Sequence, residues 1–218
     1  MQNSNGDMKK RIILTILFIV TCGNLFSQNV QNKSENEMKV FEQTLIEHMK
    51  KIKTLQCAFV QEKTSTLFDD KNVSKGNLFY QSPNALRWEY TDPSVSTLIL
   101  NGNDAALLGK NNEKLGNERV FKELGGIIIS LINGNGIAKN KQFTTVFKET
   151  EDNQVQVELT PTQRRLKDYF NTIEIKIDIK TMLANEIILN EKSGDKTIIS
   201  LTDKMVNVEI PSSVFIIK

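Results

Sequence analysis

The sequence predicts a mainly β fold with helices (α+β), built as a long, curved antiparallel sheet with helices covering one face. Two observations predict it. Short segments that alternate apolar and polar residues recur about every ten residues, which is typical of an antiparallel meander. One amphipathic segment precedes them, and a second apolar segment with helical spacing interrupts them. Without the N-terminal leader described next, roughly 190 residues fit a single domain.

The N-terminal segment has the features of a secretory signal peptide. A basic stretch, Lys9–Arg11, precedes the apolar stretch Ile12–Val20, which is too short for a membrane span of about 20 residues. We expect cleavage after Ser27. Residues 1–27 would then be the signal peptide, and residues 28–218 one exported domain.

Removal of the signal peptide would leave a chain without net charge. The full sequence has 28 Lys and Arg and 26 Asp and Glu. The first 27 residues hold three basic residues and one acidic residue, so 25 of each sign remain. A chain without net charge has no overall positive field to attract nucleic acids or anionic membranes. The local clusters Lys50–Lys53 and Arg164–Lys167 are more typical of solvated surface.

Cysteine and histidine are too scarce for the common catalytic and metal sites. If Cys22 leaves with the signal peptide, Cys57 is the remaining cysteine, and its apolar neighbours predict a small buried side chain. His48 is the single histidine, so an ordinary zinc site or a Ser-His-Asp triad is not expected. A carboxylate pair like that of glycosidases stays open without a supporting motif. We therefore predict a protein that is no enzyme and needs no cofactor.

Cys22 also leaves a second N-terminal processing route open. A cysteine at the end of a signal peptide can be acylated, which would anchor the chain as a lipoprotein. Thr21 is a poor neighbour for that reaction. Cleavage after Ser27 is therefore the preferred interpretation.

The exported chain is expected to begin with an amphipathic helix over Ser34–Lys53. Ser34 and Glu37 have capping-box spacing, and apolar residues follow at intervals of three and four. The apolar stripe consists of Met38, Phe41, Leu45, Met49 and Ile52. The helix should lead directly into a strand over Leu55–Thr66, followed by a polar turn over Asp69–Lys75.

The segment Gly76–Pro93 predicts a hairpin with one apolar face. Strand side chains alternate between the two faces of a sheet. The residues expected on the apolar face are Leu78, Tyr80, Leu86, Trp88 and Tyr90. Arg87 and Glu89 are expected on the opposite face. Whether the apolar face meets core or ligand decides the function.

Strands are expected to continue to the C-terminus. Val95–Leu100 and Ala105–Leu108 can pair across a turn at Asn101–Gly102. The later strands are expected at Phe143–Glu149, Val155–Thr160, Thr172–Ile179, Ala184–Asn190 and Lys196–Thr202. Their spacing predicts a continuous antiparallel meander.

Val120–Ile132 suits one or two short helices. Gly125–Gly126 is expected to interrupt them, and the Asn-Gly repeat at 133–136 to end them. The β-branched run Ile127–Ile129 leaves a buried strand open as the alternative.

A series of short motifs runs along the chain in a fixed order. They are L-x-x-x-F-x-Q from Leu55, G-x-L-x-Y-x-x-P from Gly76, R-W-x-Y from Arg87, L-T-P from Leu159, G-D-x-T from Gly194 and I-P-x-x-x-F from Ile210. Together they resemble the periplasmic outer-membrane lipoprotein carriers, the LolA-like family, over nearly the whole exported chain.

The resemblance implies an unclosed β-barrel whose concave apolar face is lidded by helices and receives the acyl chains of lipoproteins. Such carriers work as monomers in the periplasm, between an inner-membrane ABC-type release complex and an outer-membrane acceptor. Positions that match the family place Leu45, Met49, Trp88, Tyr90, Leu131 and Ile132 on the cavity wall. Strand parity adds Leu78, Tyr80, Leu86 and Ile99. A plain core position is the alternative for each residue.

The chain departs from the family at the first hairpin. Family members typically have a basic residue just before the proline, where it latches the lid and supports transfer. Here that residue is Ser82, which can form hydrogen bonds but carries no charge. Arg87 lies nearby and by parity faces away from Trp88. Ser82 and Arg87 are therefore the candidates for lid control and transfer.

Two further functions stay open on the same fold, transport of another lipid and sensing of lipoproteins. Sensors usually carry a second domain or a membrane anchor, and we expect neither here. The sequence does not identify the cargo, the acceptor or the resting position of the lid.

Overall fold

The computed structural model describes residues 36–66, 71–115, 118–137, 142–150 and 153–217. Contacts divide the chain into two units, Met1–Gln43 and Thr44–Lys218. In the first unit the described residues 36–43 are helical, and the helix continues to Lys50 in the second unit. The expected first helix is thus confirmed over residues 36–50. Its predicted cap, Ser34, and the predicted signal peptide lie outside the described residues.

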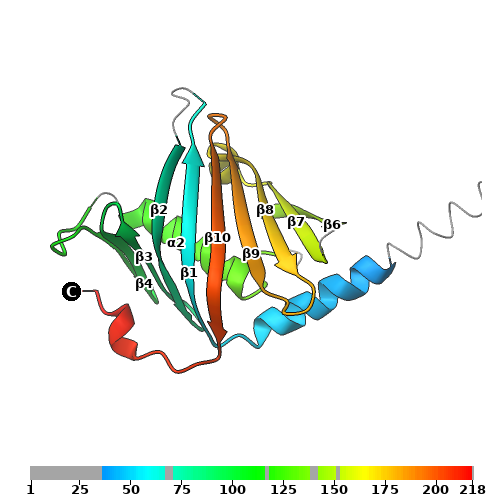
Figure 1. The fold of residues 1–218 in the computed structure, drawn as a ribbon, viewed down its shortest axis with the longest axis horizontal. Helices are drawn as coiled ribbons and strands as arrows, with labels where there is room; N and C mark the ends of the chain where they lie inside the picture. Colours follow the sequence, from blue (N-terminus) through cyan, green and yellow to red (C-terminus); the bar gives the residue numbers. More distant parts are fainter. Residues whose placement is uncertain (1–35, 67–70, 116–117, 138–141, 151–152, 218) are drawn as a thin grey trace, which may run out of the picture. The chain divides into compact units, whose positions relative to one another are not determined.

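The second unit contains a sheet of ten antiparallel strands (Figure 1). Its first five strands are β1 (Thr54–Thr64), β2 (Lys71–Gln81), β3 (Ala85–Asp92), β4 (Ser96–Asn101) and β5 (Asp104–Leu108). The others are β6 (Phe143–Glu149), β7 (Gln154–Pro161), β8 (Phe170–Asp178), β9 (Ala184–Glu191) and β10 (Lys196–Val206).

The strand order shows two meanders joined in the middle of the sheet. The order is β5-β4-β3-β2-β1-β10-β9-β8-β7-β6, so β1 pairs with β10 and every other neighbour is adjacent in sequence. β5 and β6 are the two edges, which makes the sheet an unclosed barrel. The predicted fold class is confirmed, and the continuous meander is corrected to two halves.

Helix α2 (Glu118–Ile132) connects the two edge strands and packs against β3, β4 and β5 (Figure 1). It is one continuous helix, so the predicted interruption at Gly125 and Gly126 is wrong. Gly125 lies against the sheet, where an added Cβ would come within 2.3 Å of Leu100 Cδ1. Here glycine allows close packing. The helix ends as predicted, before Gly134 at φ +78°.

The remaining helices are short. They are α3 (Arg164–Lys167) and a 3-10 turn, η1 (Ser212–Phe215). η1 contacts β3 and β4, and Arg87 Nη1 reaches the Val214 carbonyl oxygen at 3.5 Å. The C-terminal segment therefore packs on this half of the sheet.

Two strands extend beyond their predicted bounds by more than two residues. Lys71–Lys75, predicted as a turn, belongs to β2 because its backbone pairs with Thr64–Val60 of β1 despite its polar side chains. β10 continues past Thr202 because a bulge preserves its pairing with β1 as far as Val206. Hydrogen bonding to a neighbouring strand thus overrides the polar composition of both segments.

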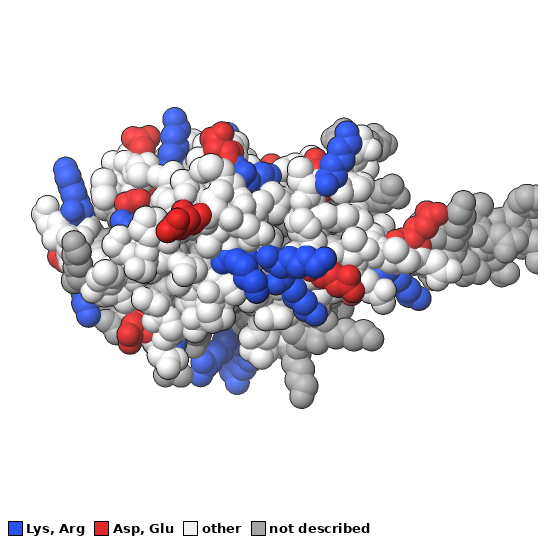
Figure 2. Space-filling model, turned by 90° about the horizontal axis from the view of Figure 1, so that it is seen from below, with Lys and Arg blue, Asp and Glu red and all other residues white. Residues whose placement is uncertain are grey.

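The two basic clusters predicted from the sequence lie on the surface. Lys50, Lys51 and Lys53 are solvent-exposed, and so are Arg164 and Arg165 of α3. Figure 2 shows one face on which Lys and Arg side chains gather in a surface that is mostly uncharged.

Candidate functional site

The concave face of the sheet and α2 enclose an apolar cavity of about 300 Å³. This volume is at the lower end of the range for small-molecule sites, about 300–1,000 Å³. The wall comes from both halves of the sheet, from α2 and from residues just before β1. Among the described lining residues, only Gln61 and Lys204 have strongly polar side chains.

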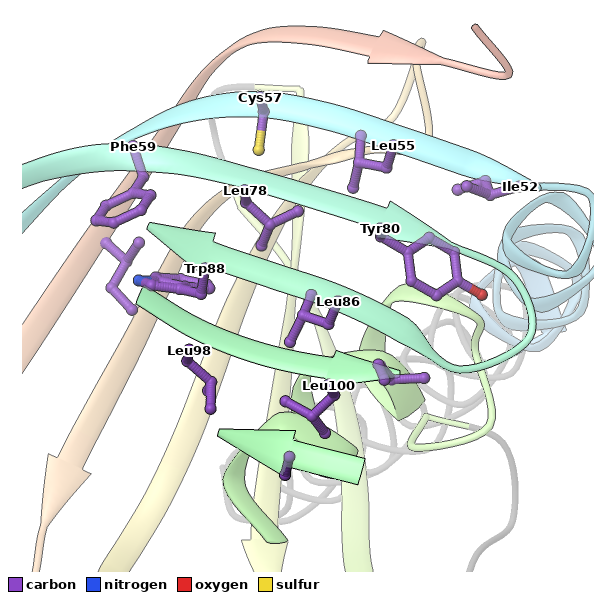
Figure 3. Packing of buried hydrophobic residues seen from close by; sticks show 13 residues of the cluster. Ile52, Leu55, Cys57, Phe59, Leu78, Tyr80, Leu86, Trp88, Leu98 and Leu100 are labelled. Carbon is purple, nitrogen blue, oxygen red and sulfur yellow. The ribbon is translucent and has the colours of Figure 1, made fainter. Parts of the chain in front are cut away.

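Six of the predicted site residues line this cavity. They are Met49, Leu78, Trp88, Tyr90, Leu131 and Ile132. Tyr80 and Leu86 are buried in the apolar cluster that forms the same face of β2 and β3 (Figure 3). Leu45 is fully buried and does not belong to the lining residues.

The structure corrects the prediction that Ile99 lies on the cavity wall. Ile99 pairs with Arg87, whereas its neighbours Leu98 and Leu100 pair with Trp88 and Leu86. Ile99 therefore lies on the opposite face, where it packs with Ala106 and Leu108. The prediction that it lines the cavity is wrong, because period-two alternation assigns Leu98 and Leu100 to the cavity side.

Most of the cavity wall was not predicted, including the part that the second meander supplies. Ile173, Ile175, Ile187, Leu189, Ile199 and Leu201 come from β8, β9 and β10. Each lies in a predicted strand, and alternation along those strands could have identified them. The missing information was that β10 pairs with β1, which brings the second meander to the same face.

An aromatic group forms one end of the wall. The Phe59 ring lies 4.5 Å from that of Trp88 and 5.3 Å from that of Tyr90, centroid to centroid. The Tyr90 hydroxyl donates a 2.9 Å hydrogen bond to Gln61 Oε1. Burial raises the pKa of Tyr90, so the phenol keeps its proton for this bond. Phe59 packs on Trp88, which lines the cavity (Figure 3).

The Tyr80 hydroxyl links the first hairpin to the end of α2. It forms side-chain hydrogen bonds with Ser82 and Asn133, and burial raises its pKa. Asn133 follows the last residue of α2 and donates its amide to the Ile129 carbonyl at 3.0 Å. Ser82 is thus linked to the end of α2 through the Tyr80 hydroxyl, without a charged group.

Replacing Tyr80 by phenylalanine is expected to loosen the last turn of α2. The change removes a hydroxyl worth about 0.5–1.5 kcal/mol of hydrogen bonding. Hydrogen exchange of the Asn133 amide should become up to about tenfold faster. Tyr169→Phe is the control, because Tyr169 is 56% exposed. Unchanged exchange in Tyr80→Phe would show that this link does not hold the helix.

Arg87 lies on the face away from the cavity, as strand parity predicted. Its Nη2 contacts Glu89 Oε1 at 2.8 Å, and its side chain is directed to the C-terminal segment through Val214. Arg87 therefore connects β3 to that segment and does not belong to the cavity wall.

The cysteine in the cavity wall, Cys57, is not an activated nucleophile. Burial raises the pKa of the Cys57 thiol to about 12, so the reactive thiolate is scarce at neutral pH. The part of the chain that the structure describes contains no group of three His, Cys, Asp or Glu that could hold a metal ion. Its helices also include none that is long and apolar enough to cross a membrane.

Comparison with known proteins identifies a family. The family model described as "Outer membrane lipoprotein carrier protein LolA" matches residues 50–218. An outer-membrane lipoprotein carrier protein of Methylococcus capsulatus is 22% identical over 136 residues, which are 62% of this chain and 62% of that protein. The chain thus aligns with less than two thirds of this relative.

Solved structures with a similar arrangement are more distant. A LolA superfamily protein from Nitrosomonas europaea has a TM-score of 0.44 and 11% identity, over 80% of this chain and 96% of its own. The lipoprotein LppX of Mycobacterium tuberculosis has a TM-score of 0.44 and 10% identity, over 78% and 95%.

Proposed function

We propose, because this chain belongs to the LolA family of outer-membrane lipoprotein carrier proteins, that it binds lipoprotein acyl chains in the apolar cavity and carries them toward the outer membrane. The observation that supports this proposal most is the apolar cavity between the open sheet and α2. Proteins of this family are carriers and not enzymes, as the scarcity of catalytic residues predicted.

The size of the cavity suits temporary binding. Burial of one methylene group contributes about 0.8 kcal/mol, so a fully enclosed sixteen-carbon chain would gain about 12 kcal/mol. Two or three such chains would approach the ceiling of non-covalent affinity and would not be released. A cavity of about 300 Å³ favours partial enclosure, which leaves an affinity that an acceptor can exceed.

The position of α2 suits a movable cover. The helix joins the two edges of an open sheet, so its displacement would widen the cavity without breaking a strand pair. The hydrogen bonds from Tyr80 to Ser82 and Asn133 hold the C-terminal end of α2, and none of these three side chains is charged. Acyl chains that bind the open form better would shift the population toward it.

The same chemistry sets the range of cargo. Apolar contact has no direction, so one cavity can accept different lipoproteins that share the acyl anchor. Export after removal of residues 1–27 would place residues 28–218 in the periplasm as a monomer. Its partners there would be an inner-membrane ABC-type release complex and an outer-membrane acceptor.

Native mass spectrometry of residues 28–218, purified without detergent, tests this function. The protein is mixed with a triacylated lipoprotein and with the same lipoprotein lacking its acylated cysteine. We expect a one-to-one complex with the acylated form alone. A folded protein that binds neither form would show that the apolar face is core.

A further inference from the structure

Lys204 is the exception in the apolar wall. Among the described residues that line the cavity, it has the one charged side chain. The residue is half-buried, and desolvation lowers its pKa. A lysine placed beside so much apolar surface costs free energy unless it binds something there.

A β-bulge directs this lysine into the cavity. Along β10, Ile199 and Leu201 face the cavity, and simple alternation would put Asp203 next. However, Thr202 pairs with Ala58 and Met205 with Gln56, so two residues of β10 lie opposite Cys57 alone. Asp203 takes φ +50° at this point. The extra residue turns Asp203 outward and Lys204 inward, which is what bulges do beside binding sites.

The contacts of Lys204 leave its charge available. Nζ donates to the Ala184 carbonyl oxygen at 2.9 Å and to Asn185 Oδ1. Both acceptors are neutral, and an ammonium group has three donors. Asp178 also attracts Lys204, but its Oδ1 accepts hydrogen bonds from the backbone of Lys180 and Thr181 and from the Thr181 hydroxyl.

We propose that Lys204 binds the anionic head group, a carboxylate or a phosphate, of an amphiphile whose acyl chain occupies the cavity. The inference goes beyond lipoprotein transport, because a triacylated cysteine contains amide, ester and thioether groups and no anion. The cavity supplies apolar contact for the chain, and the bulge supplies one charge at a fixed point of the wall.

A structural role for Lys204 makes a different prediction. The paired part of β9 and β10 ends at Glu186 and Ser200, and Lys204 bridges the space beyond it through Ala184. If this bridge were its entire role, removal of the charge would lower stability. It would not change which head group the protein prefers.

Head-group preference can be measured through Trp88, the single tryptophan, which lines the same cavity. Chains that carry bromine atoms quench indole fluorescence on contact. The probes are a brominated fatty acid, the alcohol of the same chain and its phosphate monoester, titrated at pH 8. We expect the acid and the phosphate to bind about tenfold more tightly than the alcohol.

Lys204→Met should abolish this preference, so that the variant binds the three probes with equal affinity. Lys204→Gln, which keeps a hydrogen-bonding group, should behave in the same way and serves if the Met variant folds poorly. Lys196→Met is the matched control, because Lys196 lies on β10 and is exposed. It should retain the preference of the unmodified protein.

The outcomes separate the two proposals. Equal affinity of the unmodified protein for all three probes, or an unchanged preference in both Lys204 variants, would overturn the head-group site. Preference for the acid alone or for the phosphate alone would support the site and identify the head group. Complexes with acylated lipoprotein but no head-group preference would leave the carrier function intact. A head-group preference without a complex with acylated lipoprotein would support the head-group site at Lys204 and contradict the carrier function.

Discussion

Replacing Trp88 by alanine is expected to weaken acyl-chain binding by more than tenfold. Trp88 is 5% exposed in the structure, and we expect about a third of the roughly 200 Å² that a tryptophan can bury to contact the acyl chain once α2 is displaced. At about 25 cal/mol per Å² the loss is about 1.7 kcal/mol, which is more than a factor of ten in the dissociation constant. The fraction of protein in complex with a triacylated lipoprotein, measured by native mass spectrometry, reports the change.

The control for this substitution is Arg87, the residue just before Trp88 in the same strand. Arg87 lies on the opposite face and contacts Glu89. Arg87→Ala should therefore leave acyl binding within about twofold, since partly exposed ion pairs contribute about 0–1 kcal/mol. Equal losses in the two variants would contradict the assignment of the faces.

Folding must be kept apart from binding in this comparison. Truncation of a core tryptophan can cost about 3–5 kcal/mol of stability, and Trp88 packs on Phe59 at 4.5 Å. Circular dichroism should confirm that the alanine variant is folded. Trp88→Phe, which keeps a ring against Phe59, should have an intermediate affinity.

Local patterns were sufficient wherever one face of a strand is apolar and the other polar. The segment from Gly76 to Pro93 alternates clearly, so the sequence assigned Trp88 and Arg87 to their correct faces. β6 begins and ends at its predicted residues, Phe143 and Glu149. In such strands a shift of one residue would exchange buried and exposed side chains, which makes the pattern decisive.

Local patterns failed where both faces are covered. Leu98, Ile99 and Leu100 are all buried, because the cavity lies on one side of β4 and Ile217 packs on the other. Such a strand has no polar face to show its orientation. The assignment of Ile99 therefore needed the register with Arg87 in the folded structure.

The pairing of strands far apart in the chain could not be predicted from the sequence either. β1 and β10 are separated by eight other strands in the chain, and nothing local in either indicates that they pair. The inward position of Lys204 depends on a bulge opposite Cys57, and the glycine at position 125 of α2 lies against Leu100 of β4, where a larger residue would not fit. Both features are set by the neighbouring element, and intrinsic preference decides neither.

Replacing Gly76 by alanine is expected to have the largest effect on stability. An added Cβ would lie 1.9 Å from the Glu89 carbonyl oxygen and 2.6 Å from Cζ of Phe59. The oxygen belongs to the backbone of β3, so it cannot withdraw without disturbing the pairing with β2. We expect a loss of about 3 kcal/mol or more, the range of severe overpacking. Urea unfolding followed by circular dichroism measures it.

The same substitution should also reach the cavity, because Phe59 covers Gly76 on one side and packs on Trp88 and Tyr90 on the other. Displacement of this ring would move the aromatic end of the wall and weaken acyl binding even in the folded fraction. Gly126→Ala is the matched control, since an added Cβ there meets no atom within 4 Å. Alanine in that helix should raise stability by up to about 1 kcal/mol. If Gly76→Ala were as stable as the unmodified protein, the close approach of β2, β3 and Phe59 could not be what requires glycine at this position.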